Sequence, residues 1–451
     1  METTDTMWKR AIAGARIGLL RSHPAKLLLF GYVSYILLGW ALLALPPMQA
    51  QAVAALDALF IATSAVSTTG LVTVDPGTSF TLTGETVILL LIQLGGLGYM
   101  TIGSFAVLAV QNRLSGVREK TARAAFNLPE DISARLFLRS VILFTLVVEV
   151  IGAAVLFPMF AAQGVEDPLW AAIFHAVSAF CTAGFSLFAT SLEAFRDHAG
   201  ISLVISALSL LGAMGFLIVV DGWRMLIGRA NHLGFYSKVI LRVTFWFLVA
   251  GTAFIFVAEP TLRDLPQTER LLAAFFQTMT ATTTVGFNTH PIGPLSLGVI
   301  LIITFLMVFG ASPAGTGGGL KSTCFAALVG LVKSTLKGRD CVRFAKRRVP
   351  NDKLQTATAS FAFYFGMLTV ALVALSLTEV GQPLELLLFE AASAMGTVGL
   401  SMGLTGELSD LGKLIIIVLM TAGRIGILSF GIALATHDES REEKDDNNLV
   451  L

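Results

Sequence analysis

The chain of 451 residues is short of charge and short of cysteine. Charged side chains make up 14% of it, hydrophobic side chains 55%, and the mean hydropathy is +0.78. A soluble chain carries roughly a quarter charged residues, so this composition excludes an ordinary soluble protein and predicts a membrane protein. The three cysteines, Cys181, Cys324 and Cys341, are odd in number and lack metal-ligand spacing, which argues against a disulfide framework or a zinc site.

The sequence also lacks the residue groupings of a membrane enzyme. Its six histidines and the acidic residues of its apolar runs form no His-Glu-x-x-His helix and no aspartate pair. The first 25 residues are polar and basic, without the apolar core and cleavage site of a signal peptide. We therefore expect neither an enzyme nor a nucleic-acid-binding protein, and no covalently bound cofactor.

One segment occurs four times, ending in glycine at positions 102 to 114 residues apart. Counted back from each glycine, a Phe lies ten residues earlier, a Ser or Thr six, an Ala five and a Thr two, and a bulky apolar residue follows the glycine. The copies end at Gly70, Gly184, Gly286 and Gly399, and their threonines are Thr68, Thr182, Thr284 and Thr397. Matching columns in four places indicate an internal fourfold repeat.

Each copy lies between two long apolar runs. The runs cover about residues 26–45, 85–110, 136–159, 201–220, 239–257, 295–310, 356–377 and 414–435, and the short apolar segments cover 57–67, 169–180, 271–282 and 385–395. A dozen helical residues rise only ~18 Å, too little to cross a bilayer. The pattern predicts an all-α polytopic membrane protein with eight spans and four re-entrant half-helices around one central pore.

This pattern divides the chain into four pore repeats without a separate soluble domain. The expected boundaries are 26–112, 113–222, 223–337 and 338–436, with tails at 1–25 and 437–451. Lys and Arg cluster in the N-terminal tail and in segments 111–139, 222–242 and 333–353, whereas the connections that hold the turns carry few. By the positive-inside rule, we expect a multi-pass protein of the cell membrane with cytoplasmic termini and turns that open outward.

The repeated turn has the chemistry of a cation filter. A ring of backbone carbonyls can replace the water around a cation, and glycine permits the positive φ that aims successive carbonyls the same way. The partly negative C-terminal end of each short helix also favours a cation. A single such turn could equally be the end of a packed short helix; four copies with matching columns favour a pore filter.

Two of the turns resemble potassium-channel filters: Thr284-Val285-Gly286-Phe287 and Thr397-Val398-Gly399-Leu400. Four non-identical helix–pore helix–helix repeats in one chain resemble the Trk/Ktr/HKT superfamily of potassium transporters over residues 26–436. Trk-type members usually carry two additional N-terminal spans, so the resemblance is greatest to the membrane subunits of Ktr uptake systems.

The resemblance implies a potassium filter, and it implies which residues build it. These are Val66, Ser67, Thr68, Thr69, Gly70, Cys181, Thr182, Ala183, Gly184, Thr283, Thr284, Val285, Gly286, Gly396, Thr397, Val398 and Gly399, with potassium held at the four glycines. Some plant relatives that prefer sodium have Ser in the first repeat, where this chain has Gly70. A sodium-selective or poorly selective transporter is the alternative.

The resemblance further implies a homodimer in the membrane lipid, a cytoplasmic ring of nucleotide-binding regulatory subunits and, often, sodium-stimulated uptake. Nucleotide would then act only through the regulatory partner. A carrier built from inverted repeats fits less well, because all four copies have the same order and sidedness. Channel-like conduction and coupled transport both stay open.

A stretch of small residues at 310–319 interrupts the second long run of the third repeat. A helix does not continue through so many glycines and a proline, so we expect a loop at membrane depth rather than a kink. The resemblance implies that this loop gates the pore just below the filter. The gate residues are Gly310, Ser312, Gly315, Thr316, Gly317, Gly318, Gly319, Lys321 and Arg424.

Several polar residues lie within apolar segments. Arg424 is placed near the middle of the last span, where it either faces the pore or pairs with a carboxylate or carbonyls. Glu149 has no assigned role. The position nine residues before each filter glycine holds Ile61, His175, Gln277 and Glu390, which we expect to form hydrogen bonds around the pore helices rather than touch the ion.

Overall fold

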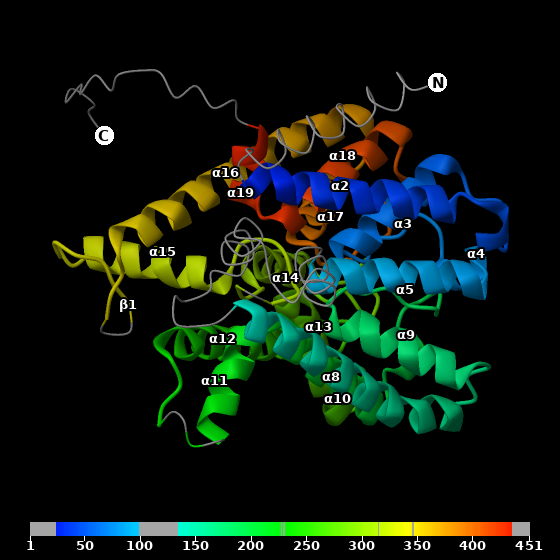
Figure 1. Cartoon of the computed structure of the whole chain (residues 1–451), viewed down its shortest axis with the longest axis horizontal. Coiled ribbons are helices and arrows are strands. Elements are labelled where there is room, and N and C mark those ends of the chain that lie inside the picture. Colours follow the sequence, from blue (N-terminus) through cyan, green and yellow to red (C-terminus); the bar gives the residue numbers. More distant parts are fainter. Residues whose placement is uncertain are drawn as a thin grey trace, which may run out of the picture.

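The structure is a computed structural model that describes residues 24–98, 134–226, 228, 231–313, 315–344 and 347–434. It is built almost entirely from helices (Figure 1). The α-helices are α2 (Pro24–Leu43), α3 (Ala55–Ser67), α4 (Pro76–Ser79), α5 (Leu82–Leu97), α8 (Ala134–Ala162), α9 (Pro168–Phe180), α10 (Ala199–Ala213), α11 (Phe216–Leu226), α12 (Phe235–Ala258), α13 (Gln267–Thr283), α14 (Leu297–Phe309), α15 (Ser322–Thr335), α16 (Asn351–Thr378), α17 (Leu384–Gly396), α18 (Asp410–Ile425) and α19 (Ile427–Leu434). Strands β1 (Arg343–Phe344) and β2 (Arg347–Arg348) form a small antiparallel pair.

Four helices, α2, α8, α12 and α16, are long and apolar enough to cross a bilayer by length and composition. The pairs α10–α11 and α18–α19 meet the same criterion only when each bent pair is taken together. Helices α3, α5, α9, α14 and α15 are apolar but shorter. The all-helical, multi-span fold class is confirmed, whereas the described residues show four to six spans by this criterion rather than eight.

Two of the predicted long runs are wrong as single helices. The run 201–220 breaks at Gly215, whose φ is 90°, and the run 414–435 breaks at Gly426, whose φ is 96°. A positive φ does not fit a right-handed helix, so the chain turns, and α18 and α19 lie at 107° to each other. The predicted run 85–110 ends as helix at Leu97, and its remainder lies outside the described residues together with most of both tails.

The four short helices α3, α9, α13 and α17 each pack against the long helix before them in the chain. Each also packs against the second helix of another unit: α5 contacts α9, α10 contacts α13, α14 contacts α17, and α18 contacts α3. These contacts form a closed cycle, with α13, α14 and α17 near the middle of the view in Figure 1. The cycle brings together the four turns that follow the short helices.

A glycine on each second helix lies against the end of a short helix. A Cβ added at Gly95, Gly212, Gly310 or Gly423 would lie 2.1, 1.9, 2.2 and 2.3 Å, respectively, from a backbone carbonyl oxygen. The carbonyls belong to Val66, Phe180, Thr282 and Met395, each four residues before its filter glycine. Glycine is therefore required here for backbone to approach backbone.

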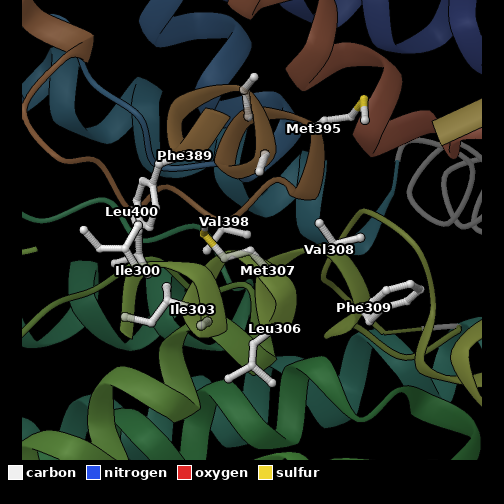
Figure 2. Packing of buried hydrophobic residues seen from close by; sticks show 14 of the residues in the cluster. Ile300, Ile303, Leu306, Met307, Val308, Phe309, Phe389, Met395, Val398 and Leu400 are labelled. Atoms are coloured by element: carbon white, nitrogen blue, oxygen red, sulfur yellow. The ribbon is translucent and has the colours of Figure 1, made fainter. Parts of the chain in front are cut away.

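Apolar side chains fill the space around this approach. Figure 2 shows Met307 of α14 next to Val398 of the fourth turn, and Ile300 next to Leu400. Met307 and Val398 are fully buried. Because interiors are close-packed, the position of α14 and that of the turn depend on each other.

We predict that Gly423→Ala destabilises the protein, because its methyl group would overlap the carbonyl of Met395. Overpacking of this kind costs roughly 1–3 kcal/mol, which a thermal melt in detergent detects as a midpoint several degrees lower. Gly366→Ala is the matched control, since a Cβ there meets nothing within 4 Å. Equal midpoints for the two variants would contradict the close approach.

Candidate functional site

The four filter glycines lie in a closed ring. A Cβ added at Gly70 would lie 2.4 Å from the carbonyl oxygen of Ala183, the residue before the next filter glycine. The same relation continues from Gly184 to Val285 at 2.3 Å, from Gly286 to Val398 at 2.1 Å and from Gly399 to Thr69 at 2.2 Å. The last contact returns to the first turn. The structure thus brings together the four turns that the sequence repeats.

The backbone of all four turns has the same unusual conformation. Among the described residues, five non-glycine residues have positive φ, and four of them are Thr68, Thr182, Thr284 and Thr397, with φ from 50° to 58°. The filter glycines follow two residues later with φ from 66° to 94°. Left-handed backbone at a β-branched residue is strained and persists only where the surroundings enforce it, as at functional sites.

Hydrogen bonds to the preceding helix enforce this conformation. The N–H before each filter glycine donates to the carbonyl six residues before that glycine: Thr69 to Ser64 (2.9 Å), Ala183 to Ser178 (2.8 Å), Val285 to Thr280 (3.1 Å) and Val398 to Ser393 (2.9 Å). In three turns the Ser side chain adds a bond: the N–H groups of Gly70 and Gly399 donate to Ser64 Oγ and Ser393 Oγ, and Ser178 Oγ donates to the carbonyl of Phe185. The Ser/Thr column of the repeat therefore anchors the turn.

The non-helical segment between α14 and α15 lies directly against three of the turns. Thr316 Oγ1 lies 3.1 Å from Thr182 Oγ1, and the N–H of Gly318 donates to Thr397 Oγ1 at 2.9 Å. A Cβ added at Gly317 would lie 2.3 Å from Thr284 Oγ1. The small residues of this loop allow it to reach the filter threonines.

The loop is also fixed at its start and end. The N–H of Ser312 donates to the carbonyl of Ala213 at 3.3 Å, and that of Gly319 donates to Gly423 at 3.4 Å. Gly310 ends α14, and a Cβ added at Gly315 would lie 2.5 Å from the carbonyl oxygen of Ala213. Of the stretch 310–319, Ala314 lies outside the described residues.

Two cationic side chains bind carbonyls of the loop. Lys321 Nζ donates to Gly317 at 2.7 Å and to Gly318 at 3.2 Å. Arg424 donates to the carbonyl of Thr316 and to two carbonyls near the end of α5, those of Gly95 and Gly96. Arg424 lies in the last turn of α18, before the break at Gly426, and so near the middle of the bent pair α18–α19. A cavity of about 920 Å³, lined in part by Lys321 and Arg424, adjoins the loop.

The side chains behind the filter form hydrogen bonds, as expected from the sequence. His175 binds Ser186, Gln277 binds the carbonyl of His290, and Glu390 binds Ser401, while the apolar Ile61 is fully buried. Glu149, which the sequence left unassigned, accepts from Gln93 at 3.2 Å and from Cys181 at 3.7 Å, so it lies behind the second turn.

Sequence reasoning missed Gln93 and the packing role of the four glycines of the second helices, of which it named only Gly310, as a gate residue. Those glycines follow the filter glycines by 25, 28, 24 and 24 residues, a variable spacing that hides the repeat. Groups of three or more His, Cys, Asp or Glu side chains suited to a metal ion do not occur in the described part of the chain. The site is therefore made mainly of backbone.

The architecture and this site agree with a known family. Residues 40–444 match the family model of TrkH, described as a cation transport protein. The chain belongs to the TrkH family. Membership and the several apolar helices together make it a multi-pass membrane protein, and its relatives are transport proteins rather than enzymes.

Several relatives match this chain over nearly its whole length. It is 34% identical to "Ktr system potassium uptake protein B" of Vibrio alginolyticus, covering 91% of each chain, and 34% identical to the protein of that name in Bacillus subtilis, covering 95% of this chain and 97% of the relative. It is also 34% identical to "Potassium/sodium uptake protein NtpJ" of Enterococcus hirae, covering 96% and 98%. The crystal structure of TrkH from Vibrio parahaemolyticus has the same fold, with a TM-score of 0.66, 20% identity and coverage of 85% and 79%.

The segment between α13 and α14 carries a titratable group near the filter. His290 is mostly buried, and its Nε2 lies 3.0 Å from Thr261 Oγ1. Burial, assisted by the positive charge of Arg196, lowers the pKa of His290, and Glu259 opposes this shift only in part. The folded protein therefore favours neutral His290.

We predict that acidification destabilises the protein partly through His290. A lowered pKa contributes stability above the unfolded value of about 6.5, and this contribution is lost progressively as the pH falls from that value through the lower pKa of the folded protein. His290→Gln should therefore reduce the drop in the thermal midpoint between pH 7.5 and 5.5. The exposed His232 provides the control variant His232→Gln. An unchanged pH dependence in His290→Gln would refute this assignment.

Proposed function

We propose that the chain mediates potassium uptake through a selectivity filter formed by residues 66–70, 181–184, 283–286 and 396–399. The observation that carries the proposal is the closed ring of filter glycines, in which each turn contacts the next. A ring of backbone carbonyls at this point replaces the hydration shell of a potassium ion. The printed names of three relatives, all potassium uptake proteins, support potassium as the ion.

The electrostatics of the ring favour a cation. Four short helices end at the turns, and the C-terminal end of a helix carries partial negative charge. The buried hydroxyls of Thr68 and Thr284 have no hydrogen-bond partner among the described residues. Burying unpaired polar groups is costly, so these hydroxyls favour water or an ion beside the turns.

The loop at 310–321 is proposed to gate this filter. It lies against the filter threonines, and Arg424 binds it to the end of α5 across the fold. Opening requires the loop to move away, which breaks the bonds from Lys321 and Arg424 to its carbonyls. The positive charge of both residues also opposes a cation leaving the filter while the loop is closed.

We infer the membrane orientation, the partners and the sodium dependence of the protein together with the filter. Both termini lie in the cytoplasm and the filter opens outward, as the distribution of Lys and Arg predicts. Two relatives are named as parts of a Ktr system, which supports the presence of partner proteins. We propose that the chain forms a homodimer and that the partner is a cytoplasmic nucleotide-binding ring. The name of the Enterococcus hirae relative, potassium/sodium uptake protein, supports sodium stimulation and keeps a less selective transporter as the alternative.

We predict that Gly286→Ser weakens potassium uptake or its preference over sodium by roughly ten-fold, or about 1.4 kcal/mol. Its side chain would meet the carbonyl of Val398, and its φ of 86° strains any residue other than glycine. Uptake is measured in cells that lack their own potassium uptake systems, with a regulatory Ktr subunit co-expressed and sodium titrated. Gly298→Ser is the control in the same repeat, because a Cβ there meets nothing within 4 Å.

Two results of this experiment would overturn the proposal. The native chain could fail to restore growth at low potassium although it reaches the membrane. Alternatively, Gly286→Ser could match Gly298→Ser in affinity and selectivity, which would exclude the ring as the filter.

We predict that Arg424→Ala raises the unstimulated rate of rubidium uptake into proteoliposomes several-fold while leaving ion preference unchanged. The substitution removes the bonds that hold the loop to α5 but leaves the filter turns intact. Arg339→Ala, at an exposed position, is the control. A rate equal to that of the native chain would show that Arg424 does not restrain the loop.

A further inference from the structure

In three of the repeats, the residue nine before the filter glycine forms a hydrogen bond to the chain that leaves the filter. In the second repeat, His175 Nε2 shares a hydrogen bond of 2.9 Å with the hydroxyl of Ser186, two residues after the glycine. Ser186 Oγ also accepts the N–H of Phe188 at 3.0 Å. One serine thus joins the pore helix to the segment beyond the filter.

The fourth repeat has the same arrangement with different chemistry. Ser401, again two residues after the glycine, donates to Glu390 Oε2 at 2.8 Å and accepts the N–H of Gly403 at 3.0 Å. In the third repeat, Gln277 and Asn288 both donate to the carbonyl of His290, at 2.7 and 3.3 Å.

In the first repeat the same two positions are apolar: Ile61 is part of a hydrophobic cluster, and Val72 packs against that cluster. The two positions are therefore joined directly in the second and fourth repeats and through the carbonyl of His290 in the third. We call this hydrogen-bonded connection the outer strut.

We propose that Glu390, through its outer strut to Ser401 and Thr405, is a positioning residue for cation selectivity. This inference rests on the proposed filter function. The strut fixes the chain two residues beyond Gly399, so it holds the fourth turn against its own pore helix on the outer side. The N–H groups of Val398 and Gly399 donate to Ser393, which holds the turn up to its glycine, whereas the strut holds the chain beyond it.

Glu390 is the strut residue with the most connections. Its carboxyl is fully buried and accepts from both Ser401 and Thr405. Thr405 Oγ1 also lies 3.0 Å from Ser401 Oγ, which closes a triangle of three side chains. Within the described part of the chain no Lys or Arg forms an ion pair with Glu390. Its hydrogen bonds are therefore what hold it in place.

The test compares Glu390→Ala, Glu390→Gln and Ser401→Ala by the ratio of rubidium to sodium uptake in proteoliposomes. We expect both alanine variants to lower this ratio by roughly five-fold or more, the factor that one hydrogen bond is typically worth. Glu390→Gln should restore the ratio, because its amide oxygen accepts from one hydroxyl and its NH2 group donates to the other, without a charge.

A matched control is available in the same repeat. Glu379 accepts from the N–H of Ser409 at 3.2 Å and from its hydroxyl at 2.6 Å, at the start of α18 and away from the filter. Glu379→Ala therefore removes an equally bonded carboxyl, and it should leave the ion ratio unchanged even where it lowers stability.

Each outcome decides the proposal. A native ratio in Glu390→Ala and Ser401→Ala overturns it, and so does an equal loss in Glu390→Gln and Glu390→Ala, because charge rather than positioning would then matter. Gly399→Ser separates this failure from failure of the filter itself. If Gly399→Ser shifts the ratio and the strut variants do not, the filter stands without the strut; if neither shifts it, the proposed function fails as well.

Discussion

The structure depends on how closely its four backbone turns approach one another. No side chain fits between each filter glycine and the next turn. Each filter glycine faces the carbonyl before the next one, and a second glycine on each following helix faces a carbonyl four residues before the turn. Both contacts exclude a Cβ. A helical membrane protein usually packs through side chains, with small residues where helices come close. Here backbone packs directly on backbone. The same close contacts that make the ring narrow also leave its turns little space to move.

The third repeat departs from this common plan in a way that follows from the same constraint. Its second helix ends at Phe309 and continues as a non-helical loop. This loop reaches Thr182 and Thr397 of neighbouring repeats. A loop can insert there only because glycine occupies its closest positions. One repeat thus provides the element that covers the ring, and Arg424 of another repeat holds that element in place.

Much of this arrangement follows from the sequence, and the remainder fails to follow for identifiable reasons. The helical membrane fold and the four turns are readable because Gly286 and its three counterparts recur with fixed neighbours. The breaks at Gly215 and Gly426 cannot be predicted in this way, because each apolar run holds more than one glycine and a glycine in such a run is compatible with a straight helix. The hydrogen-bond partners of Arg424 cannot be predicted either, because they are backbone carbonyls, which every residue carries.

The comparison of the four repeats separates two kinds of requirement. Where backbone meets backbone, all four copies keep glycine or threonine, because no other residue satisfies the conformation and the spacing together. Behind the turns, the copies hold isoleucine, histidine, glutamine and glutamate, and the last three form hydrogen bonds to the chain beyond the turn. The side chains behind the ring therefore differ while the backbone of the four turns stays alike. On the proposed filter function, we expect differences in ion preference among such chains to arise from how firmly each turn is held.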